Sequence, residues 1–515
     1  MFTDDRIFVF SRTGKTESGA VYPCMLSRRN GPYFIHSIED ISASLKDARI
    51  YPENSPEFTE AGDFLILRRS ADLILRPRKF LRVLAEGRKL YGYSRLLYCP
   101  AIGDPYLIPV LAYAGVHVFD DLFVMEESKK GVLYTPLGKL RSDRISYDEN
   151  MQYVGMLMQV LRTSILNGTL RDLVEKYTMS AKAVEILRIV DEEYSMEEEK
   201  VFPVRTPFVY ANSLQSLNRP DLVRYREKIS REYVRPSGLE YALLIPCSAR
   251  KPYSSSASHR RLINTLGSLR NNLHEIIVTS PVGLVPRELE NSYPPRFYDI
   301  PVIGKWFEEE KTMILEMLGS YFARNNYKKV IAYIGDDLKF IESALPPGSE
   351  VIHGKLTDES GLKQLEMTLR DVKTSSRLDA RSRLLMDMIS QAAFQFGSWI
   401  VPYLENSRIT MSYNQQMISV NGKVLLVYND SLGKFTITKA MGELFLKEGR
   451  YVVSIDDFKP TANVYPVGIT GVTEDIRPED EVVIAHRDSV RGVGIARMPV
   501  LAMKTLKKGV AVKVR

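Results

Sequence analysis

Residues 241–259 read Tyr241-Ala-Leu-Leu-Ile-Pro-Cys-Ser-Ala-Arg250-Lys-Pro-Tyr-Ser-Ser-Ser-Ala-Ser-His259. The apolar run at 241–245 stops at Pro246, and the loop that follows carries a thiol, two cations, several hydroxyls and an imidazole. A helical pattern begins directly after this loop. This order of residues predicts a buried strand followed by a strand-to-helix turn that carries the reactive groups. Open α/β sheets bind ligands at such turns.

The segments after this loop continue the same alternation. Residues 275–279 and 330–334 are short apolar runs typical of buried strands, and residues 308–325 have the length of a helix. Strands that alternate with helices predict a parallel sheet, and right-handed crossovers place the loops after its strands on one edge. We therefore expect the Cys247 loop, the turn after Thr279 and the Gly335-Asp336-Asp337 turn to line one crevice.

The loop holds the residues needed for nucleophilic chemistry. Cys247 is the candidate nucleophile, because nearby cations and a helix N-terminus lower the pKa of a thiol. His259 is the candidate proton donor or acceptor. The other side chains expected to bind substrate are Ser248, Arg250, Lys251, Tyr253, Ser254 and Ser256, of which the serines can also cap the helix. The competing interpretation is that a cysteine after a buried strand is an inert core residue.

The length and composition of the chain limit the classes of protein to which it can belong. At 515 residues the chain is too long for one core, so several domains are expected. No apolar run is long enough to cross a bilayer, and the acidic N-terminus does not resemble a signal peptide, so we expect a cytoplasmic protein without a membrane partner. The three cysteines are isolated and none has zinc-ligand spacing, which predicts neither disulfides nor a metal site. A net charge of +7 permits a nucleic-acid partner without demanding one.

The N-terminal region, residues 1–200, is expected to be an α/β domain. Short strands are predicted at 96–100 and 115–119, and the second ends in Asp120-Asp121, a carboxylate pair that suits either acid–base work or a turn. Helical periodicity follows, and the charged run 191–200 indicates a solvated helix end or linker. A complete (β/α)₈ barrel needs about 250 residues, so at most a partial or degenerate barrel is expected.

The C-terminal regions are richer in strands. Asn421-Gly422 sits between alternating residues at 411–428 and predicts a hairpin. Strands at 451–455, 481–485, 492–496 and 510–514 suggest a small barrel. The domains expected are residues 1–200, 201–350, 351–447 (a small α+β connector) and 448–515. Basic side chains in the last domain would contact RNA phosphates or form an ordinary solvated surface: Lys459, Arg477, Arg491, Arg497, Lys507 and Lys508.

Three parts of the sequence carry a family resemblance. Residues 463–469, 476–484, 492–497 and 509–515 resemble the PUA domain, a small RNA-binding barrel of RNA-modifying enzymes. Pro100-Ala-Ile-Gly-Asp-Pro105 and Gly115-Val-His-Val-Phe-Asp120 resemble tRNA-guanine transglycosylases. Together with the Pro246–His259 loop, the combination is similar to archaeosine synthase, a paralogue of the archaeal transglycosylase.

The resemblance implies a substrate and partners. The substrate would be tRNA that carries 7-cyano-7-deazaguanine (preQ0) in the D-arm, and the enzyme would add an amino donor, understood to be free lysine, to the nitrile. A radical SAM partner would then act on the adduct, and a homo-oligomer is compatible with the sequence. A thiolate can attack a nitrile to give a thioimide that an amine displaces, although direct attack by the amine stays open.

The resemblance also assigns other residues. Asp120 falls where transglycosylases place their nucleophilic carboxylate, but Asp121 follows it and no Pro-Thr-Arg comes next. The family's Cys-x-Cys-x-x-Cys zinc cluster is missing, so no structural zinc and no cofactor are expected. Asp121 could bind the base. Asp336 could hold the donor's ammonium group or simply form a turn.

Two other functions stay open. A base-exchanging transglycosylase would release guanine from unmodified tRNA. A non-catalytic scaffold would bind preQ0-tRNA and present it to a separate enzyme without turnover of its own.

Overall fold

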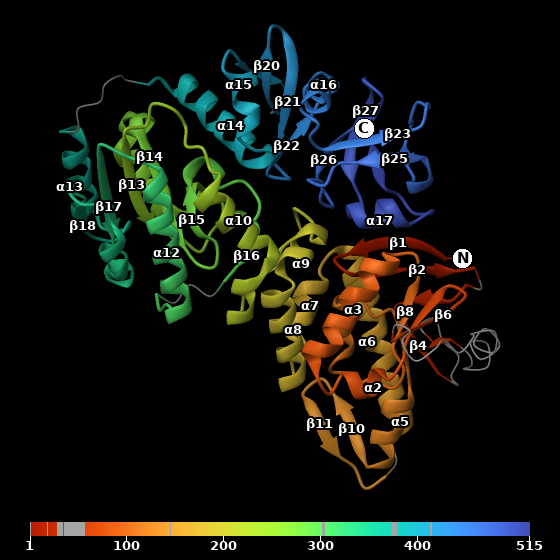
Figure 1. Ribbon diagram of the computed structural model, residues 1–515. Helices are drawn as coiled ribbons and strands as arrows, with labels where there is room; N and C mark the ends of the chain where they lie inside the picture. Colours follow the sequence, from red (N-terminus) through yellow and green to blue (C-terminus); the bar gives the residue numbers. More distant parts are fainter. Residues whose placement is uncertain are drawn as a thin grey trace. The chain divides into compact units, whose positions relative to one another are not determined.

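The computed structural model describes residues 2–17, 19–27, 34–35, 57–144, 146–300, 304–371, 378–412 and 415–515. The chain divides into two units (Figure 1). Unit 1 joins Met1–Pro207 to the C-terminal segment Gly442–Arg515, and unit 2 is Phe208–Met441. Both ends of the chain therefore belong to the same unit.

A six-stranded mixed sheet forms the centre of the N-terminal part of unit 1. Its order is β5-β4-β9-β8-β7-β6, and all neighbours are parallel except β6 and β7. The α/β class predicted for this region is confirmed, but the described strands pair as a row with β5 and β6 at its ends and do not show a closed barrel. The strands are β4 (Cys24–Leu26), β5 (Phe34–Ile35), β6 (Phe58–Ala61), β7 (Phe64–Leu67), β8 (Leu96–Tyr98) and β9 (Val118–Asp120).

Smaller strands and helices surround this sheet. An antiparallel sheet comprises β1 (Phe2–Phe8), β2 (Ser11–Thr16) and β3 (Val21–Tyr22), and a hairpin comprises β10 (Val132–Thr135) and β11 (Gly138–Arg141). Apolar helix faces bury against the sheet and give one continuous core. The helices are α2 (Ser70–Leu73), α3 (Pro77–Tyr91), α4 (Ile108–Tyr113), α5 (Leu122–Lys129), α6 (Tyr147–Asn167), α7 (Leu170–Lys176), α8 (Ala181–Glu193) and α9 (Ser195–Val201).

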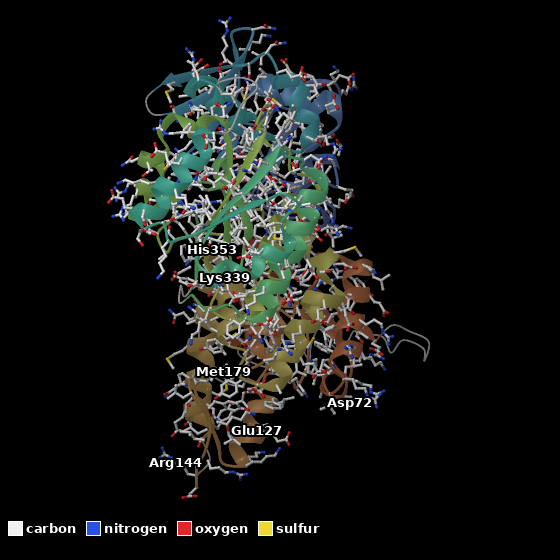
Figure 2. The ribbon with its side chains drawn as sticks, turned by 90° about the vertical axis from the view of Figure 1, so that its left-hand side faces the viewer. Asp72, Glu127, Arg144, Met179, Lys339 and His353 are labelled. Carbon is white, nitrogen blue, oxygen red and sulfur yellow. The ribbon has the colours of Figure 1, made fainter. Side chains whose placement is uncertain are left out.

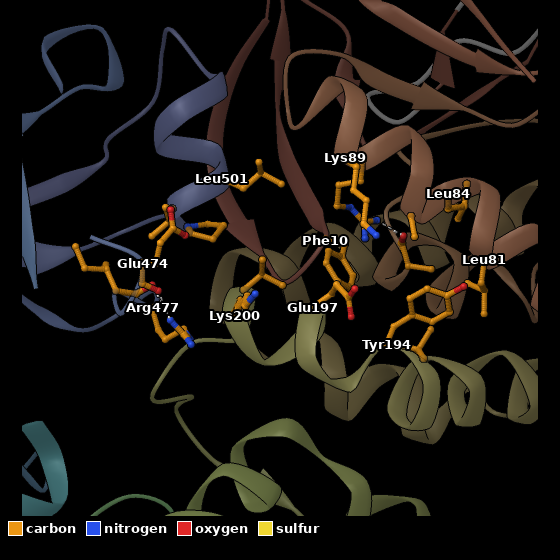
Figure 3. Close-up of a pocket in the computed structure, with 18 residues that line it drawn as sticks. Phe10, Leu81, Leu84, Lys89, Tyr194, Glu197, Lys200, Glu474, Arg477 and Leu501 are labelled. Carbon is orange, nitrogen blue, oxygen red and sulfur yellow. Dashed lines mark hydrogen bonds between the residues drawn. The ribbon is translucent and has the colours of Figure 1, made fainter. Parts of the chain in front are cut away.

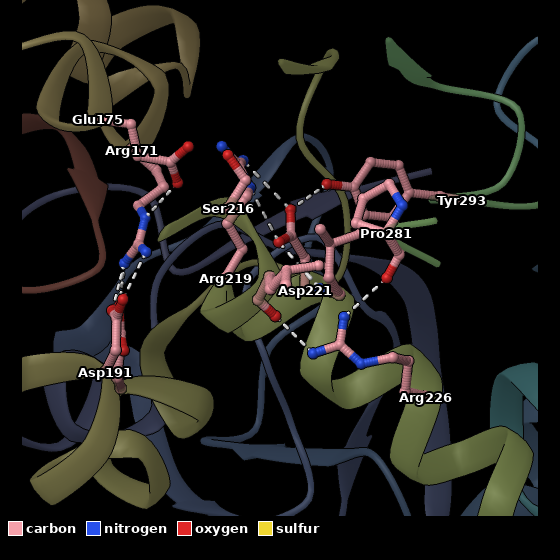
Figure 4. Close-up of polar contacts among 12 residues, drawn as sticks. Arg171, Glu175, Asp191, Ser216, Arg219, Asp221, Arg226, Pro281 and Tyr293 are labelled. Carbon is pink, nitrogen blue, oxygen red and sulfur yellow. Dashed lines mark hydrogen bonds and ion pairs between the residues drawn. The ribbon is translucent and has the colours of Figure 1, made fainter. Parts of the chain in front are cut away.

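The charged run 191–200 is a mostly exposed or half-buried helix end, as the sequence suggested, except at two positions. It forms the end of α8 and most of α9, and Asp191 and Glu198 are buried. The reason is Arg171, which is itself fully buried and donates to both oxygens of Asp191 at 2.5 and 2.7 Å (Figure 4). Buried charges persist when they are paired, and a carboxylate run offers no local sign that a distant arginine will meet it.

The C-terminal part of unit 1 is a second six-stranded sheet, with the order β24-β28-β27-β26-β23-β25. The four strands predicted here are confirmed. The core of this sheet includes Ile7 and Tyr93, so it continues into the N-terminal part of the unit. The elements are α16 (Lys439–Glu448), β23 (Val452–Ile455), β24 (Asn463–Val464), β25 (Ile469–Val472), β26 (Glu481–His486), β27 (Ser489–Ala496), α17 (Val500–Thr505) and β28 (Val512–Val514).

Unit 2 is organised by a five-stranded sheet of order β15-β14-β13-β17-β18, parallel except for β15. β13, β14 and β17 are buried along nearly their whole length, as expected of strands covered on both faces. The predicted parallel sheet is confirmed. Its strands are β13 (Tyr241–Pro246), β14 (Leu273–Thr279), β15 (Gly283–Pro286), β17 (Lys329–Ile334) and β18 (Glu350–His353).

Helices accompany this sheet in two contacting pairs, α10 with α12 and α11 with α13. The helical pattern after the Cys247 loop forms α11, which ends at Leu266 because Gly267 adopts φ +48°. A two-stranded parallel pair adds β12 (Val209–Tyr210) and β16 (Tyr298–Asp299). The helices are α10 (Pro220–Arg231), α11 (Ala257–Leu266), α12 (Glu308–Arg324), α13 (Glu359–Arg370), α14 (Ala380–Phe396) and α15 (Val401–Leu404).

An antiparallel four-stranded sheet completes unit 2. Its strands are β19 (Arg408–Ser412), β20 (Gln415–Val420), β21 (Lys423–Asn429) and β22 (Lys434–Ile437), paired in chain order. The predicted hairpin is confirmed: Asn421 and Gly422 both have positive φ, +49° and +78°, as a tight two-residue turn requires. Residues 413–414 of that predicted segment lie outside the described residues.

Candidate functional site

The strand order of unit 2 places a ligand site at the end of β13. From β13 the chain turns to β14 on one side, and β17 lies on the other side, leading on to β18. The connections from β13 and β17 therefore diverge, which opens a crevice at the carboxyl ends of these strands. The loop at Pro246–His259 begins at this point.

A cavity of about 90 Å³ lies there, and the three strand ends meet in its wall as the sequence predicted. Cys247 and Lys251 come from the loop after β13, Thr279 and Ser280 from the end of β14, and Asp337 from the turn after β17. The remaining lining residues are Pro246, Ser248, Val278, Tyr298, Ile300, Gly304, Lys305, Trp306, Glu310 and Leu338. We call this cavity the strand-end crevice.

The Cys247 thiol is half-buried in the wall of the crevice. Burial raises its pKa, while a hydrogen bond with Thr279 and the charge of Lys251 act in the opposite direction without overcoming it. The net shift is upward, which corrects the expectation of a lowered pKa for the free protein. Desolvation of the thiolate outweighs the attraction of the cation at this half-buried position.

Lys251 is the cation that enters the crevice. Its ammonium nitrogen lies 4.0 Å from the centroid of the Tyr298 ring, and burial lowers its pKa. The lowered pKa makes Lys251 a better proton carrier near neutral pH than an exposed lysine. Arg250, in contrast, is exposed and does not line the crevice. Ser248 lines it and donates to the Arg250 carbonyl at 3.1 Å.

The rest of the loop, residues 253–259, does not line the crevice. Tyr253 is fully buried and its hydroxyl is 2.8 Å from that of Tyr298. The Ser254 backbone N–H donates to Glu290 at 2.9 Å. Ser256 caps α11 as expected, its hydroxyl accepting from the His259 N–H at 3.2 Å. These contacts hold the loop in place instead of presenting it to a ligand.

His259 lies in this buried layer as well. Its side chain is fully buried, is absent from the crevice lining, and accepts from Arg287 at 2.9 Å through Nδ1. Burial and the Arg287 charge lower its pKa to about 3, so the ring is neutral at physiological pH. The structure therefore argues against His259 as a general acid and favours a role in positioning the loop.

The carboxylate that lines the crevice is Asp337, whereas Asp336 was expected from the sequence. Asp336 is exposed and pairs with Lys339 at 2.7 Å, and Figure 2 labels Lys339 on the ribbon of this unit. Asp337 lines the crevice and raises the pKa of Cys247. Both carboxylates are exposed, and the strand pattern could not show which of them lines the crevice, since a 3₁₀ turn starts at Asp336.

Sequence reasoning also missed the segment from Tyr298 to Glu310. Trp306 lines the crevice, and its buried Nε1–H has no acceptor among the described residues. Glu310 accepts from the Ser280 hydroxyl at 2.5 Å and from the Phe307 N–H at 2.8 Å. No motif marks this segment. Its only local sign is the polar and aromatic content directly before α12.

Helix α10 holds the turn after β14, which forms part of the crevice wall. Arg226 donates to the Pro281 carbonyl at 2.8 Å and to the Leu217 carbonyl (Figure 4). Arg219 pairs with Asp221 in the buried layer nearby, and Tyr293 donates to the same carboxylate. These contacts hold the turn after β14, which carries Ser280 into the crevice.

Asp120 and Asp121 belong to unit 1. Asp120 is fully buried and accepts from the Tyr98 hydroxyl at 2.8 Å and from the N–H groups of Ala101 and Leu122 at 3.0–3.2 Å. Asp121 accepts from the Tyr147 hydroxyl at 2.5 Å. These partners bind the carboxylates to the ends of β8 and β9 and to α6, so neither is presented to a ligand in this conformation.

The basic residues of the C-terminal domain fall into two groups. Lys459, Lys507 and Lys508 are exposed. Arg477 donates to both oxygens of Glu199, and Arg497 donates to Glu479 at 2.6 Å. Arg491 is intermediate, since it pairs with the exposed Asp457 at 2.6 Å. Arg477 and Arg497 thus serve contacts within unit 1, while the three lysines are exposed to a polyanion, although Lys508 also lies 3.9 Å from Glu17.

A larger cavity, of about 310 Å³, lies in unit 1 (Figure 3). Its wall is mainly apolar and comes from α3, α8, α9, the loop between β25 and β26 and the start of α17. Arg88 lies in this wall 3.5 Å from the Phe10 ring and donates to the Ala114 carbonyl at 2.6 Å. In the part of the chain that the structure describes, no cluster of His, Cys, Asp or Glu could hold a metal ion, and no helix is long and apolar enough to cross a membrane.

Known proteins resemble this chain over its full length. The archaeosine synthase subunit alpha of Thermoplasma acidophilum is 45% identical over 517 residues, covering 100% of both chains.

The chain belongs to the archaeosine synthase alpha-subunit family.

The corresponding subunit of Methanosarcina acetivorans is 30% identical over 88% of this chain and 79% of its own length. A tRNA-guanine(15) transglycosylase of Methanobrevibacter smithii is 24% identical over 70% of this chain and 52% of its own. Residues 455–515 match the PUA domain, and residues 222–369 match a domain of unknown function, DUF5591. The resemblance to archaeosine synthase, to transglycosylases and to the PUA domain is thereby confirmed.

The matched regions contain both the strand-end crevice and the exposed lysines of the C-terminal domain. The DUF5591 match runs from α10 into α13 and so contains the Cys247 loop and Asp337. The PUA match covers the exposed lysines. The two matched regions lie in different units of the structure.

Proposed function

We propose that this chain is a tRNA-modifying transferase that adds an amino donor, with lysine as first candidate, to the nitrile of preQ0 in the tRNA D-arm. The observation that carries the proposal is the position of Cys247, half-buried in a crevice at the topological switch point, beside a cation and a carboxylate. Family membership supplies the reaction class.

The chemistry needs an activated nucleophile and a proton. The Cys247 thiolate attacks the nitrile carbon, and the nitrile nitrogen takes a proton, which gives a thioimide bound to the enzyme. The donor amine then attacks the same carbon, and the thiolate leaves as an amidine forms. Lys251 is the proton carrier in this scheme, since it enters the crevice and its pKa is lowered, whereas His259 does neither.

Two further residues orient the reactants. Asp337 offers a carboxylate for the ammonium group of an amino-acid donor, the role first expected of Asp336. Trp306 offers an aromatic face and an indole N–H without an acceptor among the described residues, which suit a flat base taken out of the helical stack. Tyr253, Ser254, Ser256 and His259 act indirectly by holding the loop.

Unit 1 would deliver the tRNA. The PUA domain supplies Lys459, Lys507 and Lys508 for phosphate contacts. We retain the division into four domains, the descent of the N-terminal sheet from a transglycosylase barrel and a radical SAM partner as parts of the proposal. Within unit 1, Asp120 and Asp121 would act indirectly, by holding the ends of β8 and β9.

The test is a donor assay with nucleoside mass spectrometry. The purified chain is incubated with preQ0-tRNA and with lysine, glutamine or ammonia separately. We expect a mass gain equal to one lysine with lysine alone. The variant Lys363→Ala, on the exposed face of α13, is the matched control and should equal wild type. Lack of any added mass with every donor would overturn the proposal.

The same assay separates the rival functions. A base-exchanging transglycosylase would release guanine from unmodified tRNA, a reaction that the buried and fully engaged Asp120 disfavours. A scaffold would bind preQ0-tRNA without any mass change. Loss of turnover in Lys251→Met and Asp337→Asn, with binding retained, would exclude the scaffold.

A further inference from the structure

Three hydroxyl groups form a chain that leads to Cys247. The Tyr253 hydroxyl is 2.8 Å from that of Tyr298, which is 2.7 Å from the Thr279 hydroxyl. Thr279 and Cys247 each follow one of the paired residues Pro246 and Val278 on neighbouring strands, both line the strand-end crevice, and the Thr279 side chain acts to lower the pKa of the Cys247 thiol. Tyr253, Tyr298 and Thr279 are at most 2% exposed, so the chain is shielded from water. They come from the loop after β13, the end of β14 and β16.

The direction of this chain depends on the state of the sulfur. A hydroxyl can donate or accept, and the Thr279 proton can also go to the Ser280 carbonyl, which lies 3.3 Å away. A thiolate is charged and accepts more strongly than a carbonyl at that distance. Once the thiol is deprotonated, Thr279 donates to sulfur, Tyr298 to Thr279 and Tyr253 to Tyr298.

We propose that Thr279, Tyr298 and Tyr253 act as a hydroxyl relay that stabilises the thiolate form of Cys247. The inference rests on the proposed function, in which that thiolate is the nucleophile. Thr279 is the positioning residue in contact with sulfur, and the two tyrosines orient it. Aligned hydroxyl dipoles polarise one another in a dry interior, so the chain supports the anion more than one hydroxyl would.

The relay would offset the cost of forming a thiolate at a half-buried position. Burial disfavours the thiolate, and the facing charges pull in opposite directions, Lys251 towards the thiolate and Asp337 away from it. Lys305 and Glu310 also line the crevice. A fixed array of neutral donors helps the anion without adding a charge that would repel the donor's ammonium group.

The test is the pH profile of Cys247 alkylation by iodoacetamide in the full chain. Cys24 and Cys99 are fully buried in the core of unit 1, so they react slowly, and Cys247→Ala gives the background. Thr279→Val should move the midpoint of the profile up by about one to two pH units. Tyr298→Phe should move it in the same direction by less. The limiting rate at high pH reports access to the sulfur.

Two controls make the result decisive. Thr279→Ser keeps the hydroxyl and should keep the wild-type profile. Tyr225→Phe removes another buried hydroxyl of the same core, one that donates to the Leu284 carbonyl at 3.2 Å, and should leave the midpoint unchanged. If Thr279→Val matches Tyr225→Phe, the relay is refuted. Because alkylation needs no tRNA, this outcome is independent of whether turnover proceeds through Cys247.

Discussion

Replacement of Arg287 by methionine should destabilise unit 2 severely. Arg287 donates to Glu275 at 2.7 Å, to Glu290 at 2.9 Å and to His259 at 2.9 Å. Glu290 also accepts from the Ser254 N–H, so a single guanidinium supports the Cys247 loop at two points. The substitution leaves Glu275, which is 2% exposed, with Arg270 as its remaining cation.

The expected loss follows from this burial. Removing one partner of a buried ion pair costs about 3–5 kcal/mol, because the other charge stays out of water. The free energy of unfolding is measured by urea titration with tryptophan fluorescence. The chain has two tryptophans, Trp306 and Trp399, and both lie in unit 2, so the signal reports this unit alone.

The matched control is Arg231→Met, which has the same chemistry on α10 of the same unit. Arg231 pairs with Glu227 on an exposed helix face, where an i, i+4 pair contributes about 0.3–0.5 kcal/mol. If Arg287→Met destabilises unit 2 no more than Arg231→Met does, the buried support of the loop is not real. A large loss in the first and a small one in the second is the expected pattern.

Two further predictions concern protons and RNA. The pKa of the His259 ring is about 3 in the folded protein, against an ordinary value of 6.5. Between these two pH values the unfolded chain binds a proton at His259 and the folded chain does not. The free energy of unfolding therefore decreases as the pH falls from 6.5 towards 3. Urea titrations should show wild type losing about 2 kcal/mol more than His259→Asn between pH 6.5 and 5, and equal losses would contradict a buried neutral ring. Replacing Lys459, Lys507 and Lys508 by alanine should weaken tRNA binding and reduce the slope of log K against log salt by about 0.7–0.9 for each phosphate that the protein no longer neutralises, whereas an unchanged slope would place the RNA elsewhere.

The sequence predicted the crevice because its causes are local. The apolar run before Pro246, the turn after Thr279 and the acidic turn after Ile334 each follow a buried strand, and a parallel sheet brings such strand ends together. The cap at Ser256 was equally visible, since a serine three residues before His259 suits a helix start. Strand periodicity and turn chemistry were enough for these features.

The chemistry around the loop was harder to predict because it depends on distant partners. His259 looked reactive, but Arg287, 28 residues further on, meets it in the core and keeps it neutral. Arg477 was expected to contact RNA, but its guanidinium donates to Glu199, which lies 278 residues earlier in the chain. Tyr298 and Trp306 enter the crevice from a segment with no motif. Burial and pairing of this kind arise from tertiary packing.

The central claim is that Cys247 carries the reaction at the strand-end crevice, and a covalent intermediate tests it most directly. The purified chain is mixed with preQ0-tRNA without any donor, and the mixture is analysed on a denaturing gel and by peptide mass spectrometry. The account predicts a protein–tRNA adduct that maps to Cys247, disappears when donor is added and is absent in Cys247→Ala. Donor addition by Cys247→Ala at the wild-type rate, with no adduct in either protein, would contradict it.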